Sequence, residues 1–319
     1  KGKQTTMNKI ASITNTKDNT IFFGFNLKKI KADNPGRSAR DVFMEHQTRV
    51  TGFTKILYRE NSEITYCLRT VVMPTGMSAK ASTTTIGLIV MVPGEAIDEI
   101  ESLSKTLKIL LQSNFKNHQW QEITTIADLD LLLNPLDWNK SNNFEIRRKI
   151  ERITLNNYLP AQNLGFLSKP TLKDCQRESI DFIHPYSKNL GGYEKLLRTM
   201  IGYQQPVVIS AILSPTKITQ QEVDHLHEQI NLCERAADFP DKTLQVTRSR
   251  ARSLTESLTA TTLELQDAPF LLSFYISSEK PLDSLLLENA GLALSDASGG
   301  SDAYSYSGGY FKSFYFAHS

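Results

Sequence analysis

The sequence is poor in cysteine, and its three cysteines lie far apart. Cys67, Cys175 and Cys233 are the only ones among 319 residues. None belongs to a CxxC pair, the spacing that zinc knuckles use, and three scattered thiols do not make a disulfide framework. We therefore predict no metal site and a reducing, cytoplasmic location.

Long apolar runs are also missing. The longest, residues 86–92, is much shorter than the roughly 20 residues that a membrane-spanning helix needs. The first residues, KGKQTTMNK, lack the apolar stretch of a signal peptide. We therefore predict a protein without a membrane span. Because the chain begins with Lys1, we expect either that the natural start is Met7 or that the chain is a fragment.

Neither sign of charge is in large excess. The chain has 36 Lys and Arg against 34 Asp and Glu, a net charge of +2, so no global field attracts nucleic acid. Two local basic clusters remain. EIRRKIER contains Arg147 and Arg148, and TRSRARS contains Arg248 and Arg252, which share one face if that segment is helical. Either cluster is suited to contact phosphates or an acidic partner, and a solvated helix face explains the same charges.

Recognisable catalytic motifs are absent from the sequence. Residues 76–83, GMSAKAST, contain Gly, Lys and Ser, but they lack the spacing GxxxxGK[ST] and precede a strand instead of following one. The nucleophile motif GxSxG does not occur. His225 and His227 lie two apart on a predicted helix, so they point in different directions and cannot share a metal. We predict that this chain is not an enzyme and has no catalytic, cofactor-binding or metal-binding residue.

What the sequence does contain is one arrangement repeated three times: an apolar strand, a turn and an amphipathic helix. The repeats begin at Thr85, Val207 and Phe270. After the first two turns, apolar residues recur at steps of three and four, which places them on one helix face. These residues are Ile97, Ile100, Leu103, Leu107 and Leu110 in the first repeat, and Val223, Leu226, Ile230 and Cys233 in the second. The pattern predicts sheets that are covered by helices.

Local signals define further elements. Residues 20–30, 50–59, 63–73, 118–125 and 309–317 are predicted to be extended. Helix starts are predicted at two capping boxes, Thr125 with Asp128 and Thr219 with Glu222, and Pro281 is suited to the first turn of a helix. A further helix is indicated by the spacing of Leu244, Ala251, Leu254 and Leu258.

These elements predict an α+β protein made of two layered ferredoxin-like subdomains with mainly antiparallel sheets. The first subdomain is placed at residues 1–155 and the second at 193–319. Residues 156–192 are rich in Asn, Pro, Gly and Ser, which is typical of a connecting segment.

Three consecutive segments carry a resemblance to a known family. They read IGLIVMVPGEAIDEIESLSKTLKILL, WQEITTIADLDLLLNPLDWNK and FEIRRKIERITL. Their order resembles the region ahead of the ATPase core in HerA-type translocases, relatives of the conjugative-transfer ATPases. The later FLLSFYISSEKPLDSLLLENAG is similar to the second sheet layer of that region, so the resemblance covers roughly residues 60–316. It implies a hexameric, ATP-driven, DNA-handling protein with its motor C-terminal to this chain.

The resemblance carries no catalytic residue with it, because the Walker motifs of that family do not occur here. We therefore expect a non-catalytic region for assembly and for docking to a partner or to DNA. Its partners would be further copies of the chain, an effector protein or DNA, with Arg147, Arg148, Arg248 and Arg252 as the candidate contacts. The alternative is a self-contained scaffold or adaptor without a motor.

Overall fold

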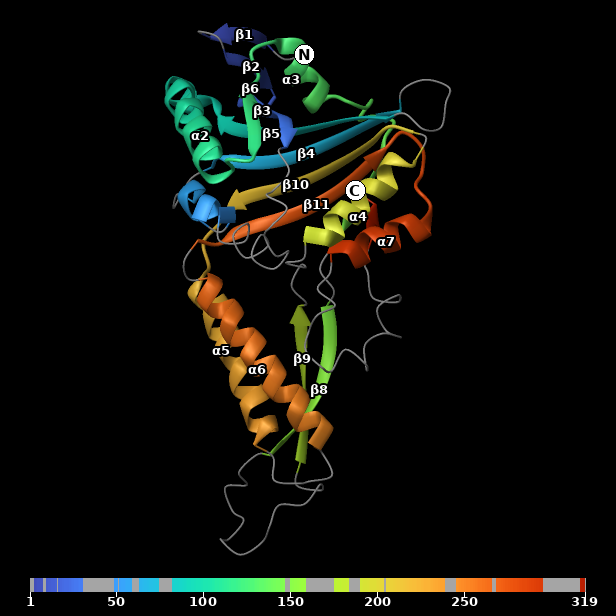
Figure 1. The fold of residues 1–319 in the computed structure, drawn as a ribbon. Helices are drawn as coiled ribbons and strands as arrows, with labels where there is room; N and C mark the ends of the chain where they lie inside the picture. Colours follow the sequence, from blue (N-terminus) through green and yellow to red (C-terminus); the bar gives the residue numbers. More distant parts are fainter. Residues whose placement is uncertain are drawn as a thin grey trace, which may run out of the picture.

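The computed structural model confirms an α+β fold. It describes residues 3–7, 10–15, 17–30, 49–50, 52–58, 63–74, 82–146, 150–158, 175–183, 190–203, 205–238, 245–265, 268–294 and 316–318. These residues form a large antiparallel sheet with helices on both faces, and a smaller group of helices and strands that extends away from it (Figure 1). We call the sheet with its covering helices the body and the extension the arm.

The body is built on one sheet of ten strands, in which every pairing is antiparallel. In spatial order the strands are β1 (Lys3–Met7), β2 (Ile10–Asn15), β3 (Thr20–Ile30), β5 (Ser82–Pro93), β4 (Thr65–Pro74), β10 (Val207–Pro215), β11 (Phe270–Ser278), β7 (Asn142–Ile146) and β12 (Phe316–His318). The tenth strand, β6 (His118–Glu122), pairs with the second half of β3.

The two predicted subdomains share this sheet. β4 from the first pairs with β10 from the second, with Val72 opposite Val207. β7 from the first likewise pairs with β11 and β12 from the second. The structure therefore has one continuous main sheet where the repeated pattern predicted two.

Strand β4 shows why the centre of the sheet is buried on both sides. Tyr66 and Val72 are buried on one face, and Cys67 and Val71 are buried on the other, because successive side chains of a strand alternate between faces. The alternation of apolar and more polar residues in this segment is typical of a half-buried strand. A strand in the middle of a sheet with helices on both faces buries both sets of side chains.

Three α-helices and a short helical segment cover the first face of the sheet. Helix α2 (Ile100–Asn114) follows the 3-10 helix η1 (Gly94–Glu99) and packs on Phe23, Phe25 and Val90. Helices α4 (Leu190–Ile201) and α7 (Ser284–Leu294) pack on the same face further along, over Val207 and Ile276. The helical stretch of residues 52–57 completes this layer.

Two predictions on this face are wrong. Residues 50–59 were expected to be extended, but residues 52–57 are helical, because Phe53 and Leu57 are one helical turn apart and both enter the core beside α2. Pro281 was expected in the first turn of a helix, but α7 begins only at Ser284, and the side chain of Asp283 accepts a hydrogen bond from the backbone N–H of Leu285.

On the second face, helix α3 (Ile126–Leu133) packs on Cys67, Val71 and Ile89. Its start is the predicted one: the hydroxyl of Thr125 accepts a hydrogen bond from the backbone N–H of Asp128 at 3.2 Å. Its end is held by Arg69 of β4, whose Nη1 donates to the carbonyl oxygens of Leu132 and Leu133 at 2.8 and 3.1 Å.

The arm consists of two hairpins from separate parts of the chain. Strands β8 (Ile150–Tyr158) and β9 (Cys175–Ile183) form a two-stranded sheet, and helices α5 (Gln220–Ala237) and α6 (Gln245–Leu265) form an antiparallel pair. Figure 1 shows the four elements side by side, extending away from the body sheet. The predicted connecting segment, residues 156–192, thus contains the end of β8, the whole of β9 and the start of α4.

Candidate functional site

Two of the four arginines that the sequence singled out can be placed. Arg248 and Arg252 lie one turn apart on α6, as their spacing predicted. Arg147 and Arg148 lie outside the described residues, between β7 and β8. The candidate site is therefore described at the α6 cluster.

Arg248 holds the end of the neighbouring helix. Its Nε donates a hydrogen bond of 3.0 Å to the carbonyl oxygen of Ala237, the last residue of α5. The last carbonyl groups of a helix have no partner within the helix and carry partial negative charge, so a guanidinium at this position satisfies and stabilises them. Part of the hydrogen-bonding capacity of Arg248 is therefore used inside the arm.

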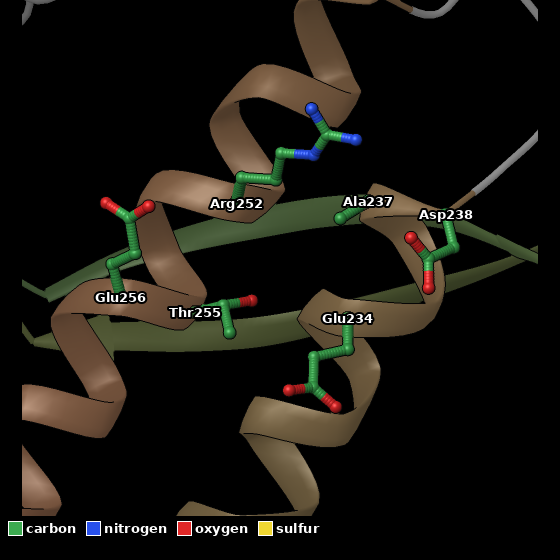
Figure 2. Close-up of a pocket in the computed structure, with 6 residues that line it drawn as sticks. All are labelled: Glu234, Ala237, Asp238, Arg252, Thr255 and Glu256. Carbon is green, nitrogen blue, oxygen red and sulfur yellow. The ribbon is translucent and has the colours of Figure 1, made fainter.

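Arg252 lines a groove between the two helices. The groove has a volume of about 330 Å³, and its six lining residues are Glu234, Ala237, Asp238, Arg252, Thr255 and Glu256. In Figure 2, Glu234 and Ala237 of α5, with Asp238 just after its end, lie across the groove from the lining residues of α6, and β8 and β9 lie behind the helix pair. The four charged side chains are exposed, whereas Ala237 is buried and forms part of the floor.

The helical spacing of the sequence creates this lining. Glu234 lies in the last turn of α5, and Asp238, four positions later, is the residue just after the helix end. Arg252 and Glu256 are one turn apart on α6, so they face the same side. Thr255 lies beside them, but its hydroxyl donates to the carbonyl oxygen of Ala251 at 3.0 Å within the same helix. The groove therefore presents three carboxylates and one guanidinium.

This charge balance decides what the groove attracts. A phosphate approaching Arg252 would meet three carboxylates in the same groove, and like charges repel at this range. A mixed set of this kind suits a partner surface that presents basic groups together with an acceptor for the guanidinium. The groove therefore carries more negative than positive charge.

The start of α5 is fixed by the predicted capping box. The hydroxyl of Thr219 accepts from the backbone N–H of Glu222, and the carboxylate of Glu222 accepts from the backbone N–H of Thr219 at 2.8 Å. The hydrogen bonds from the Thr219 backbone and hydroxyl lower the pKa of Glu222. With Arg248 at its other end, α5 is held at both termini.

Cys67 and Cys233, whose side chains the structure describes, are both buried. Cys233 is buried between α5 and α6, and burial, with a smaller contribution from the charge of Glu234, raises the pKa of its thiol to about 11. Burial also raises the pKa of the Cys67 thiol, and the nearby charge of Arg69 offsets part of that rise. Because the thiolate is the reactive form, both side chains act as packing residues at neutral pH.

A partly buried polar cluster is centred on Arg69 of β4 and Ser210 of β10. Nε of Arg69 donates to the hydroxyl of Ser210 at 3.1 Å, and the guanidinium lies over the ring of Trp138 at 5.4 Å. Nε1 of Trp138 in turn donates to the carbonyl oxygen of Leu133 at 3.0 Å. These contacts join the sheet to the end of α3.

The acidic side of the groove was not predicted from the sequence. Glu234, Asp238 and Glu256 were not singled out, although the segments ERAAD and RSLTE show the one-turn spacing that places such residues together. Reading α5 and α6 as a packed pair would have brought these carboxylates next to Arg252. That pairing depends on the chain reversal between the helices, which periodicity alone does not reveal.

Among the described residues, no group of three or more His, Cys, Asp or Glu side chains is arranged to hold a metal ion. No helix in the described part of the chain combines the length and apolar character needed to cross a membrane. Across the whole sequence, no family model and no curated protein matches the chain.

Proposed function

We propose that this chain is a non-catalytic assembly and docking region of a HerA-like DNA-translocating ATPase, whose motor would lie C-terminal to it. In this proposal the chain works in the cytoplasm and oligomerises or binds an effector protein, while DNA is handled by the intact protein. The translocase setting rests on the sequence resemblance. The docking role rests on the arm.

The arm is the observation that carries the docking role. Two hairpins from separate parts of the chain pack together and extend from the body, and they expose a charged groove along the helix pair (Figures 1 and 2). A projecting element with both signs of charge provides register and selectivity for a partner surface, because matching charges attract and mismatched charges are costly. The partner that suits the groove is another protein, which includes a second copy of the chain.

Sedimentation velocity and DNA titration of the same variants test the docking role. We expect Arg252→Ala and Glu234→Lys to weaken self-association or effector binding while leaving DNA binding at two salt concentrations unchanged. Lys105→Ala, at an exposed position on α2 in the body, is the charge-matched control for Arg252→Ala. Arg248→Ala is less informative, because it also removes the hydrogen bond to Ala237.

The contrary results are equally specific. If Arg252 contacts a DNA phosphate, Arg252→Ala should reduce the slope of log K for DNA binding against log salt concentration by about one. The arm would then be a DNA-binding element. If neither assay responds to Arg252→Ala or Glu234→Lys, the groove is a solvated helix face and the docking role is wrong.

The translocase setting has its own test, the reading frame downstream of Ser319. A GxxxxGK[ST] motif that follows a strand and opens a helix would support a motor. A stop codon close to Ser319 would favour the alternative, a self-contained scaffold or adaptor that uses the same arm.

A further inference from the structure

Strand β7 lies one strand away from the end of the body sheet. On one side it pairs with β11 along its whole length, from Asn142 to Ile146. On the other side it carries β12, the end strand of the sheet. The register between β12 and β7 places Phe316 opposite Ile146, Ala317 opposite Glu145 and His318 opposite Phe144. Because the pairing with β11 does not involve β12, β7 keeps its place in the sheet when β12 leaves.

The edge of β7 that β12 occupies suits an extended segment with apolar residues at alternate positions. Ile146 is buried, and Phe144 is half-buried, in the core that α4 and α7 form over this end of the sheet. Glu145, between them, lies on the other face, because successive residues of a strand alternate. An incoming antiparallel strand therefore gains ladder hydrogen bonds, and the positions opposite Ile146 and Phe144 fall on the face that the helices cover.

In the described part of the chain, β12 packs extensively on β7 and on no other helix or strand. Residues 295–315 separate β12 from the end of α7 in the sequence, and a chain of that length spans at most about 70 Å when fully extended. The register involves only β7 and residues 316–318. The same three residues of a second copy would therefore make the same ladder with β7, at no loss of strand pairing.

We propose that the edge of β7 is a strand-docking site and that, in the assembled protein, it takes residues 316–318 of a second copy in place of its own. This inference rests on the self-association in the proposed function, because copies that are already held together present their segments to one another at a high effective concentration. Exchange of an identical element is a low-cost route to an oligomer, since each copy gives up one strand and receives the same strand. The exchanged strand joins the bodies, whereas the groove on the arm selects the partner.

Disulfide cross-linking between co-expressed chains tests the exchange in the full chain. Two differently tagged chains are produced together, one with Glu145→Cys and the other with Ala317→Cys, both in a Cys175→Ser background whose other two cysteines are buried. Directly opposite residues of an antiparallel pair have Cα atoms about 4.5–5.5 Å apart, which suits a disulfide. We expect a disulfide-linked heterodimer after mild oxidation of the purified protein.

Two further changes make the cross-link specific to strand pairing. Phe316→Asp in the Ala317→Cys chain places a carboxylate opposite the buried Ile146, so the heterodimer should be lost, whereas Phe316→Leu should retain it. A chain with Lys105→Cys, at an exposed position on α2, takes the place of the Glu145→Cys chain as the control for random collision. This control should give no heterodimer.

A single chain that carries both Glu145→Cys and Ala317→Cys separates the outcomes. A disulfide within this chain, together with no heterodimer from the co-expressed pair, would show that β7 keeps its own β12 and that the exchange is wrong. No disulfide in either experiment would also overturn it, because residues 316–318 would then not occupy the edge. If the exchange fails while Arg252→Ala still weakens self-association, the docking role of the arm stands without it.

Discussion

At the scale of single residues, Arg69 connects three parts of the body. Its guanidinium bonds to Ser210 on β10 and to the carbonyl end of α3, and it lies over the ring of Trp138. Hydrogen bonds from a charged donor are stronger than neutral ones, and the carbonyl groups at a helix end need partners. We therefore expect Arg69 to stabilise the body, because its Nε and Nη1 groups have polar acceptors.

Replacing Arg69 tests this account. Arg69→Met keeps much of the apolar stem but leaves the carbonyl groups of Leu132 and Leu133 without their donor, so we expect a loss of about 1.5–3 kcal/mol in the free energy of unfolding. Urea unfolding measures it. Lys105→Met, at an exposed position on α2, should change the stability little. Equal stability of Arg69→Met and the parent would mean that water replaces the guanidinium.

Two glycines of the sheet allow close approaches of different kinds. A Cβ added at Gly24 would lie 2.6 Å from the carbonyl oxygen of Leu88 on the next strand, whereas at Gly87 it would lie 2.3 Å from the Cδ1 of Leu132 on α3. A side chain can rotate away, but a paired backbone cannot. We therefore expect both alanine variants to lose stability, by about 1–3 kcal/mol for overpacking, with Gly24→Ala at or above the upper end.

Gly52 provides the matched control for these variants. It lies in the helical stretch of residues 52–57, and a Cβ there would have no atom within 4 Å. Gly52→Ala should be neutral or raise the melting temperature, because alanine gains about 0.5–1 kcal/mol over glycine in a helix. If Gly24→Ala melts like Gly52→Ala, the strands adjust more freely than the structure indicates.

Contacts between residues were predictable only where they are local. The capping boxes at Thr125 and Thr219 were found because both partners lie within one turn. The bond between Arg69 and Ser210 joins residues 141 positions apart, and no spacing rule reaches that far. The same limit hid Glu234 and Asp238, which line the groove with Arg252 from the other side.

At the scale of elements, α2 offers a test of helix burial. Leu103 is buried against the core of the body, whereas Ile109 on the same helix is 65% exposed. A charge buried without a partner costs several kcal/mol, a large part of the about 5–15 kcal/mol that holds a domain together. We expect Leu103→Asp to unfold the protein or make it insoluble and Ile109→Asp to melt close to the parent, as measured by thermal unfolding.

Helix α5 should respond less strongly to the same change. Leu226 is only half-buried where it packs on the core of the arm, so an aspartate there keeps part of its hydration. Leu226→Asp is expected to lower the melting temperature by less than Leu103→Asp does. A larger loss for Leu226→Asp would show that the arm, and not the body, limits the stability of the chain.

Helices and strands were predictable where the periodic pattern of apolar residues extended over many positions. Helices α2, α5 and α6 and strands β3, β10 and β11 lie where the sequence placed them. The short segment of residues 50–59 was wrong because its apolar residues fit a strand and a helix equally, and packing beside α2 decides between them. The structure of a short segment depends on the elements that pack against it, and the sequence of the segment alone does not show which elements these are.

At the scale of the whole molecule, the absence of a phosphate-loop motif leads to a biochemical prediction. The isolated chain should neither bind nor hydrolyse ATP, because GxxxxGK[ST] does not occur in the sequence. A coupled phosphate-release assay on the purified chain measures this. Turnover that disappears in Lys80→Ala would show that residues 76–83, most of which lie outside the described part of the chain, form a nucleotide site after all.

The composition and the repeated pattern were enough to predict an α+β class with antiparallel strands, but not the division of the molecule. Strands on both sides of the predicted connecting segment enter one sheet, and two separate hairpins leave it to form the arm. Which strands become neighbours depends on long-range pairing, for which a single sequence carries no direct signal. The site was missed in part for the same reason, because its two sides come from different helices.

The pairing of β4 with β10 has a consequence for how the protein is made. During synthesis β4 can pair with β5 at once, but its other edge has no partner until the second half of the chain has left the ribosome. An unpaired apolar edge invites contact with other chains, and sheets that join distant segments form slowly. The growing chain therefore passes through a stage in which chaperones and neighbouring nascent chains compete for the edge that β10 will later occupy.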